Sequence, residues 1–123
     1  METITEDYVS FETAKLLKEK GFTETCLMRY NKVGDLVEEA YKFNWNFQTI
    51  DYSAPTLQIA IKWLLKKYNI FICVLFLEES NGFGYTIEDI IKNKYIATSK
   101  STSYKEPEEA AEIAIKYCLK ILI

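Results

Sequence analysis

The spacing of apolar and polar residues predicts one helix near each end of the chain and one in the middle. Ser10 is a typical N-cap and Gly21 a typical C-terminal residue, so the first helix is expected over residues 10–20. The second helix is predicted to begin at Ser53, its expected N-cap, and the third to extend over 107–122. In all three segments apolar side chains recur at the helical period, which predicts amphipathic helices packed on a common core.

Between the first two helices the pattern predicts a β-hairpin over about residues 25–50. Residues 26–30 have the composition of a short strand, and residues 31–35 contain turn-forming side chains. The return strand is predicted over 41–48, where aromatic and hydrophilic side chains alternate. A helical turn over 36–40 is an alternative interpretation of the start of this segment.

After the middle helix, residues 70–77 form the longest apolar run of the chain. A strand that is apolar on both faces is typical of the centre of a sheet, so we predict that this run is the central strand. The glycines that follow indicate a turn, and residues 85–91 are predicted as its partner strand. A helix over 86–92 is the alternative, and residues 95–98 add a further expected strand.

The predicted order of elements is helix, two strands, helix, two or three strands, helix. This order indicates an α+β fold in which about three helices cover one face of an antiparallel sheet of four to five strands. The chain has 123 residues, contains no repeat and shows no linker, so we predict one domain over 1–123.

The alternating segment is the most informative part of the chain. In a regular strand it places four rings on one face, and that face is either a wall of the core or an exposed contact surface. Trp63 in the middle helix raises the same question. We favour the buried wall, and the candidate protein-contact residues are Tyr41, Phe43, Trp45, Phe47 and Trp63.

Composition and charge limit the classes of partner and compartment. The net charge of -3 gives no overall attraction to nucleic acid, which makes a nucleic-acid partner improbable. Cys26, Cys73 and Cys118 are odd in number and widely spaced, as expected for reduced thiols in a cytoplasmic protein. The N-terminal residues are acidic, unlike a signal peptide, and no apolar run approaches the roughly 20 residues that span a bilayer. We therefore expect no membrane association.

The chain contains no histidine, and this absence removes the commonest general base and metal ligand in proteins. The carboxylates of Glu78, Glu79, Glu88 and Asp89 flank the turn near Gly82, but such acidic residues are ordinary at a solvated hairpin end. We therefore predict no catalytic residue, no metal site and no cofactor.

A weak nucleic-acid binder is the alternative function. Its candidate contacts are Lys92, Lys94, Tyr95 and Lys100, which combine positive charge with a ring that can stack on bases. The order of elements after residue 53 resembles that of a double-stranded RNA-binding domain. That family begins its last helix with lysines, whereas Glu108 and Glu109 stand here and repel phosphates, so the resemblance is limited to architecture.

Three segments of the chain, residues 8–22, residues 53–58 and residues 108–110 with 114–119, resemble small uncharacterised proteins encoded by gut Bacteroidales and by their phages or mobile elements. The resemblance covers most of the chain and carries no catalytic residues across. It implies a cytoplasmic accessory protein that acts on a host or phage partner. Together with the missing catalytic groups, it favours a non-enzymatic protein-interaction module, whose partner is another protein or a second copy of the chain.

Overall fold

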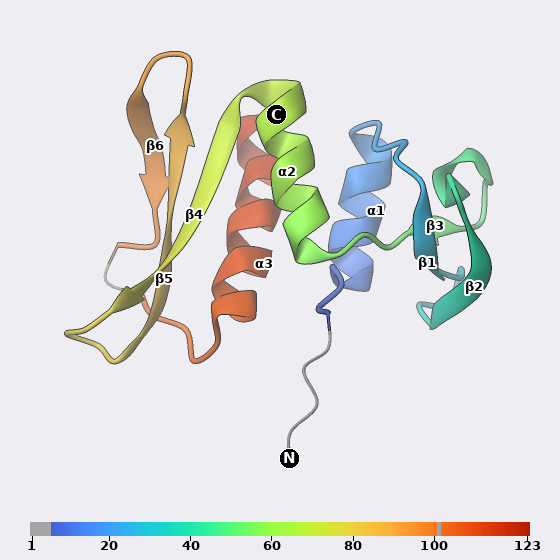
Figure 1. Cartoon of the computed structure of the whole chain (residues 1–123), viewed down its shortest axis with the longest axis horizontal. Helices are drawn as coiled ribbons and strands as arrows, with labels where there is room; N and C mark the ends of the chain where they lie inside the picture. The colour runs from blue at the N-terminus through green and yellow to red at the C-terminus, as the bar shows by residue number, and fades with distance from the viewer. Residues whose placement is uncertain (1–5, 101) are drawn as a thin grey trace.

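The helices of this protein lie between two antiparallel sheets. The computed structural model describes residues 6–100 and 102–123, and it places α1, α2 and α3 between a sheet of order β2-β1-β3 and a sheet of order β4-β5-β6 (Figure 1). The predicted α+β class and the order of elements are confirmed. The strands, however, divide into two three-stranded sheets, whereas the sequence had suggested one sheet with helices on a single face.

The three helices are α1 (Phe11–Glu19), α2 (Leu57–Tyr68) and α3 (Pro107–Tyr117), and α3 continues into a π-helical turn over Cys118–Leu122. They all run in the same direction, so their C-terminal ends lie together at one end of the molecule (Figure 1). α2 and α3 pack on the second sheet, while α1 packs on α3 and on β3. The helices thus form the middle layer.

The ends of the helices follow local hydrogen bonding. Ser10 caps α1 as predicted, since its Oγ accepts from the backbone N–H of Thr13 at 3.2 Å. The predicted cap of α2 is wrong, because Thr56 takes this role and accepts from the N–H of Ile59. Ser53 instead belongs to the strand before the helix, where it is fully buried.

The first sheet contains β1 (Cys26–Tyr30), β2 (Leu36–Phe43) and the short β3 (Tyr52–Ser53). β1 and β2 form the predicted hairpin, so the alternative of a helical turn over 36–40 is wrong. The turn is closed by the Asn31 side chain, whose Oδ1 accepts from the N–H groups of Val33 and Asp35.

The alternating aromatic segment is not one strand. β2 ends at Phe43, and a 3-10 turn follows over Trp45–Phe47. The reason is local, because the Asn44 side chain accepts from the N–H of Asn46 at 3.1 Å and offers the backbone an alternative to the sheet ladder. The rings therefore do not share one face: Trp45 is 7% exposed, whereas Phe47 is 79% exposed.

The second sheet contains β4 (Ile70–Leu77), β5 (Gly82–Asp89) and β6 (Lys94–Thr98). β4 pairs with β5 over eight consecutive residue pairs without a bulge. β5 lies in the centre, so the prediction that residues 70–77 form the central strand is wrong. The helix considered over 86–92 is also wrong, because β5 is a strand up to Asp89, whose carboxylate then accepts from the N–H groups of Ile91 and Lys92.

The core lies between the helices and the inner faces of the two sheets. Its largest fully buried side chains come mainly from the helices and the second sheet, and they include Phe22, Leu17, Leu64, Ile87, Ile115 and Leu119. One polar cluster joins α1 to α3 at its margin. There the carboxylate of Glu112 accepts from the Ser10 N–H and Oγ and from Thr13 Oγ1.

Candidate functional site: the free edge of strand β4

The five aromatic residues singled out from the sequence do not form one surface. Tyr41 and Phe47 are exposed, Phe43 and Trp63 are half-buried, and Trp45 is buried. Neither of the two alternatives derived from the strand pattern applies as a whole, because the chain turns after Phe43.

Trp45 has a structural role in the first sheet. Its indole N–H donates to the backbone carbonyl of Cys26 at 2.7 Å, and the rings of Tyr41 and Phe43 lie 5.9 and 5.0 Å from its ring. The guanidinium of Arg29 lies over the indole, 5.7 Å from the ring centre. The indole N–H and the aromatic ring of Trp45 therefore both have partners within the chain.

Trp63 has a similar role at the end of α2. It contacts Phe22 and Tyr68 edge-to-face, with ring centres 5.4 and 5.6 Å apart, and the ammonium of Lys67 lies 5.0 Å from its ring centre. This ring closes the core near the C-terminal end of the helix and presents little free surface.

The residues considered for nucleic-acid contact are divided between two ends of the second sheet. Lys92, Lys94 and Tyr95 lie at the β5–β6 turn and are exposed. Lys100 follows the far end of β6 and shares a surface hollow with Glu78 and Glu79. An acidic pair beside Lys100 weakens any attraction of this lysine to phosphate.

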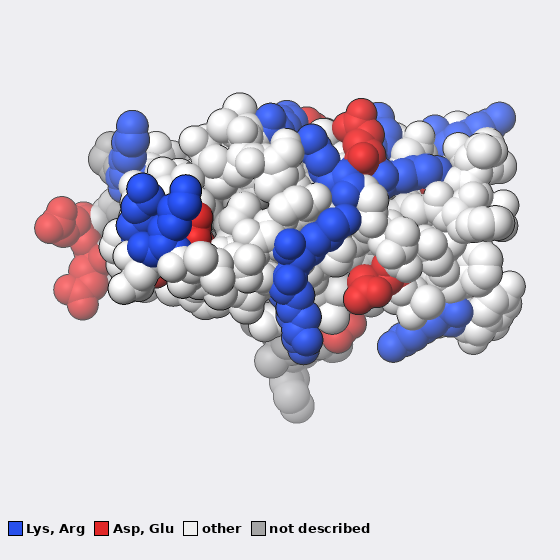
Figure 2. Space-filling view, turned by 90° about the horizontal axis from the view of Figure 1, so that it is seen from above, with Lys and Arg blue, Asp and Glu red and all other residues white. Residues whose placement is uncertain are grey.

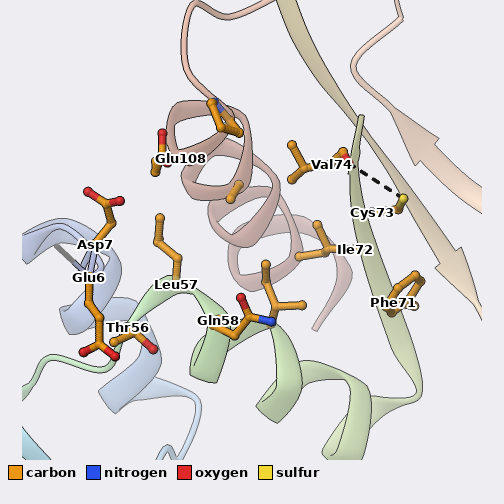
Figure 3. Close-up of a pocket in the computed structure, with 13 residues that line it drawn as sticks. Glu6, Asp7, Thr56, Leu57, Gln58, Phe71, Ile72, Cys73, Val74 and Glu108 are labelled. Carbon is orange, nitrogen blue, oxygen red and sulfur yellow. Dashed lines mark hydrogen bonds between the residues drawn. The ribbon is translucent and has the colours of Figure 1, made fainter. Parts of the chain in front are cut away.

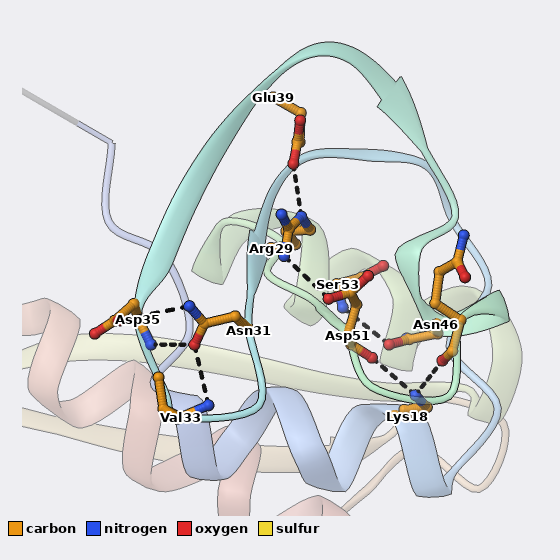
Figure 4. A network of polar contacts seen from close by, with 10 residues as sticks. Lys18, Arg29, Asn31, Val33, Asp35, Glu39, Asn46, Asp51 and Ser53 are labelled. Carbon is orange, nitrogen blue, oxygen red and sulfur yellow. Dashed lines mark hydrogen bonds and ion pairs between the residues drawn. The ribbon is translucent and has the colours of Figure 1, made fainter.

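A network of polar contacts holds the first sheet and its loops in place (Figure 4). Arg29 pairs with Glu39 at 2.6 Å and with Asp51 at 3.0 Å, and Lys18 donates to the carbonyls of Gln48 and Asp51. Asn46 donates to the Phe22 carbonyl and accepts from the N–H of Ser53. These groups are engaged with one another and act as a scaffold.

The described residues contain no cluster suited to covalent or metal chemistry. No three His, Cys, Asp or Glu side chains gather there as metal ligands, and the candidate carboxylate of Asp89 caps a turn. Burial raises the pKa of the Cys26 thiol to about 11 and that of Cys118 to about 12, so both remain protonated at neutral pH. Cys73 is half-buried on β4, and all three cysteines are free.

The outer strands of the two sheets differ in how they are protected against pairing with another chain. β2 contains Glu38, Glu39 and Lys42, and β3 has only two residues. β6 is short, begins with a lysine and pairs irregularly with β5. Charge, shortness and bulges are the usual means by which proteins protect free edges.

β4 has none of these protections. Its eight residues, Ile70 to Leu77, contain no charge and no proline, and within the described residues β5 is its only strand neighbour. Phe71 and Phe76 are 38% and 51% exposed on it. A long, uncharged and unpaired edge of this kind is a template for strand addition.

A groove of about 630 Å³ follows this edge (Figure 3). Four consecutive residues of β4, from Phe71 to Val74, line it, although successive side chains of a strand point to opposite faces. The groove therefore borders the free backbone of β4 as well as its side chains. Its other walls come from the N-terminal halves of α2 and α3, including Leu57, Ile61 and Ala111.

The charges of the groove are all of one sign. The carboxylates of Glu6, Asp7 and Glu108 stand across it from β4, and none of the described residues that line it is basic (Figure 3). The opposite end of the molecule, where the helices end, displays gathered Lys and Arg side chains (Figure 2). Lys66 and Lys67 belong to this basic end, in the last turn of α2. The groove is thus acidic, whereas the face at which the helices end is rich in basic side chains.

The sequence contained a signal for this site that pointed to a different conclusion. The uncharged run over 70–77 predicts a central strand, yet within the described residues β5 is the only strand that pairs with it. None of the helices in the described part of the chain is long and apolar enough to cross a membrane.

No protein-family model, no curated protein and no solved structure shows a significant similarity to this chain.

Proposed function

We propose that this protein is a non-enzymatic protein-interaction module that binds a partner by strand addition at the free edge of β4. The observation that carries the proposal is the eight-residue, uncharged edge of β4 beside an open groove. An added strand satisfies the free N–H and C=O groups of β4, and its alternate side chains enter the groove formed with α2 and α3.

The energetics suit a reversible interaction. Each new backbone hydrogen bond contributes about 0.5–1.5 kcal/mol net, so a strand of six residues supplies a moderate gain before apolar burial is added. Association itself opposes this gain by roughly 4–15 kcal/mol. We therefore expect affinities in the micromolar range, where Kd of 1 μM corresponds to about -8.2 kcal/mol.

The resemblance of the chain to small phage and mobile-element proteins agrees with this proposal. An accessory protein that works in the cytoplasm acts through contact with a host or phage protein, and it needs no cofactor for this. Three free cysteines, two of them buried, suit a reducing compartment.

The test uses a phage-displayed library of random 12-residue peptides and the chain immobilised at low density, so that neighbouring copies do not meet. We expect enrichment of peptides with alternating apolar residues, because only an extended segment pairs along β4. Cys73→Lys should weaken their binding about tenfold or more, since a lysine on the edge strand opposes strand addition.

Two control variants separate the edge from general effects of substitution. Cys73→Ser keeps the site small and uncharged and should bind the selected peptides as the wild type does. Ala40→Lys places the same charge on β2, the outer strand of the other sheet, where Ala40 is exposed. If no peptide is enriched, or if Ala40→Lys and Cys73→Lys weaken binding equally, the proposed function is wrong.

A further inference from the structure

We propose that the partner at the free edge of β4 is a second copy of this chain. The β4 strands of the two copies then pair in antiparallel orientation. The sheet β4-β5-β6 of one copy and the same sheet of the other copy become one six-stranded sheet. This inference rests on the proposed function, because it names the occupant of the same edge and groove.

The strand is complementary to itself. A two-fold axis perpendicular to the sheet pairs residues that face the same side, so an axis at Val74 sets Phe71 opposite Leu77 of the second copy and Cys73 opposite Leu75. Every such pair within β4 is apolar. Self-pairing therefore brings no like charges together between the two β4 strands themselves, and apolar cross-strand pairs are favourable.

The exposed ring of Phe76 has a receiving site in this arrangement. Phe76 is 51% exposed, and the same axis places it opposite Ile72 of the second copy. Ile72 lines the groove together with Leu57 and Ile61, on the side of the sheet that the helices cover (Figure 3). Each copy thus contributes one ring and one groove. A two-fold interface therefore contains two equivalent contacts of the Phe76 ring with the groove of the other copy.

The charges at the two ends of β4 favour the antiparallel orientation. Glu78 and Glu79 follow the strand directly, while Lys66 and Lys67 end the helix that precedes it. Antiparallel pairing brings Glu78 and Glu79 of one copy toward Lys66 of the other, at both ends of the joint. A parallel arrangement would place like charges together and is disfavoured.

Sedimentation equilibrium measures the mass of the wild type from about 10 μM to about 1 mM, the range expected for a reversible pair. We expect the weight-average mass to rise from 14.4 kDa toward twice that value, 28.8 kDa. Phe76→Ala should raise the dimer dissociation constant about tenfold or more, because the ring is lost from two symmetric contacts. Phe47→Ala removes an exposed ring from the 3-10 turn that follows β2, far from β4 in the fold. This variant should leave the dimer dissociation constant unchanged.

A charge exchange tests the orientation. Lys66→Glu and Glu79→Lys should each weaken the dimer about threefold to tenfold at low salt, because each places like charges at both ends of the joint. The two substitutions combined should restore the wild-type constant. Lys32→Glu, in the turn of the first sheet, is the matched control and should have no effect. All of these side chains are exposed, so folding is expected to be retained.

A mass of 14.4 kDa that persists at about 1 mM would overturn the dimer. A dimer that is indifferent to Phe76→Ala, or that the combined charge exchange fails to restore, would overturn this mode of pairing. Neither result affects peptide binding at low density, so strand addition at β4 would stand while its occupant would be a different protein. Failure of the peptide selection, in contrast, would remove the proposed function itself.

Discussion

The two sheets have the same number of strands and the same antiparallel pairing, yet different interactions hold them together. The sheet β4-β5-β6 has an unbroken register between β4 and β5 and is packed against α2 and α3 through apolar side chains such as Ile72 and Ile87. The sheet β2-β1-β3 is irregular, with a shift between Cys26 and Met28, and depends on polar contacts of Arg29, Lys18 and Asn46.

The difference teaches where a partner is to be expected. Charged residues on β2 stabilise the first sheet and at the same time protect its long edge against pairing with another chain. The second sheet obtains its stability from apolar burial. Its edge strand β4 has no charged residue on either face, so no charge protects this edge. The apolar sheet is therefore the one open to strand addition.

The largest effect is expected within the alternating aromatic segment. Trp45→Ala removes a buried ring and the indole N–H that donates to the carbonyl of Cys26. The free energy of unfolding should therefore fall by about 3–5 kcal/mol. Phe47→Ala, two residues away but exposed, should change stability by at most about 0.5 kcal/mol. Urea denaturation of both variants checks this, and equal losses would mean that the two rings share one environment.

A smaller loss is expected from the loop that connects β2 to β3. Asn46→Ala removes a donor to Phe22 and an acceptor for Ser53, and should destabilise the protein by about 1–3 kcal/mol. Gln48→Ala is the matched control, since its exposed side chain makes no hydrogen bond within the described residues. The stability of this variant should equal that of the wild type. A loss of similar size in both variants would show that the loop does not depend on the Asn46 contacts.

The ion pairs of Arg29 should make the first sheet sensitive to salt. Arg29→Met removes the pairs with Glu39 and Asp51, which are partly exposed, and should lower stability by about 1–2 kcal/mol. In 1 M NaCl, where screening acts over about 3 Å, the loss should shrink. Hydrogen exchange of the β1 and β5 amides locates the effect, and a salt response in β5 equal to that in β1 would contradict the comparison.

The smallest effect at neutral pH concerns the buried thiols. Because burial raises the pKa of Cys26 to about 11 and that of Cys118 to about 12, the folded state holds these protons more tightly than the unfolded state. Their contribution to stability is complete below about pH 9 and is lost as the pH rises toward 12. A thiol reagent at pH 7.5 should therefore modify Cys73 first, and equal rates for all three thiols would contradict this order.

The predictions from sequence were most accurate where short-range chemistry decides the structure. The cap at Ser10, the turn at Asn31, the strand Cys26–Tyr30 and the helical periods depend on neighbouring residues, and all were confirmed. The aromatic segment was misjudged for a reason equally local, since Asn44 ends the strand with its own side chain. Such a side-chain hydrogen bond competes with strand formation even where the alternation of side chains favours a strand.

The candidate site could not be found in this way. Its groove joins residues of the N-terminal segment, α2, β4 and α3, and its significance depends on β4 having a neighbour on one side only. An apolar run has the same appearance in a central strand and in an unprotected edge strand, because the pattern reports burial of side chains and not the pairing of the backbone.

By itself, then, the sequence determined the kind of secondary structure, the apolar faces that must be covered and the chemistry that a chain without histidine lacks. The tertiary structure alone decided that the strands divide into two sheets and that β4 is left at an edge. The physical reason is that local propensities act over a few residues, whereas sheet order depends on contacts between segments far apart in the chain.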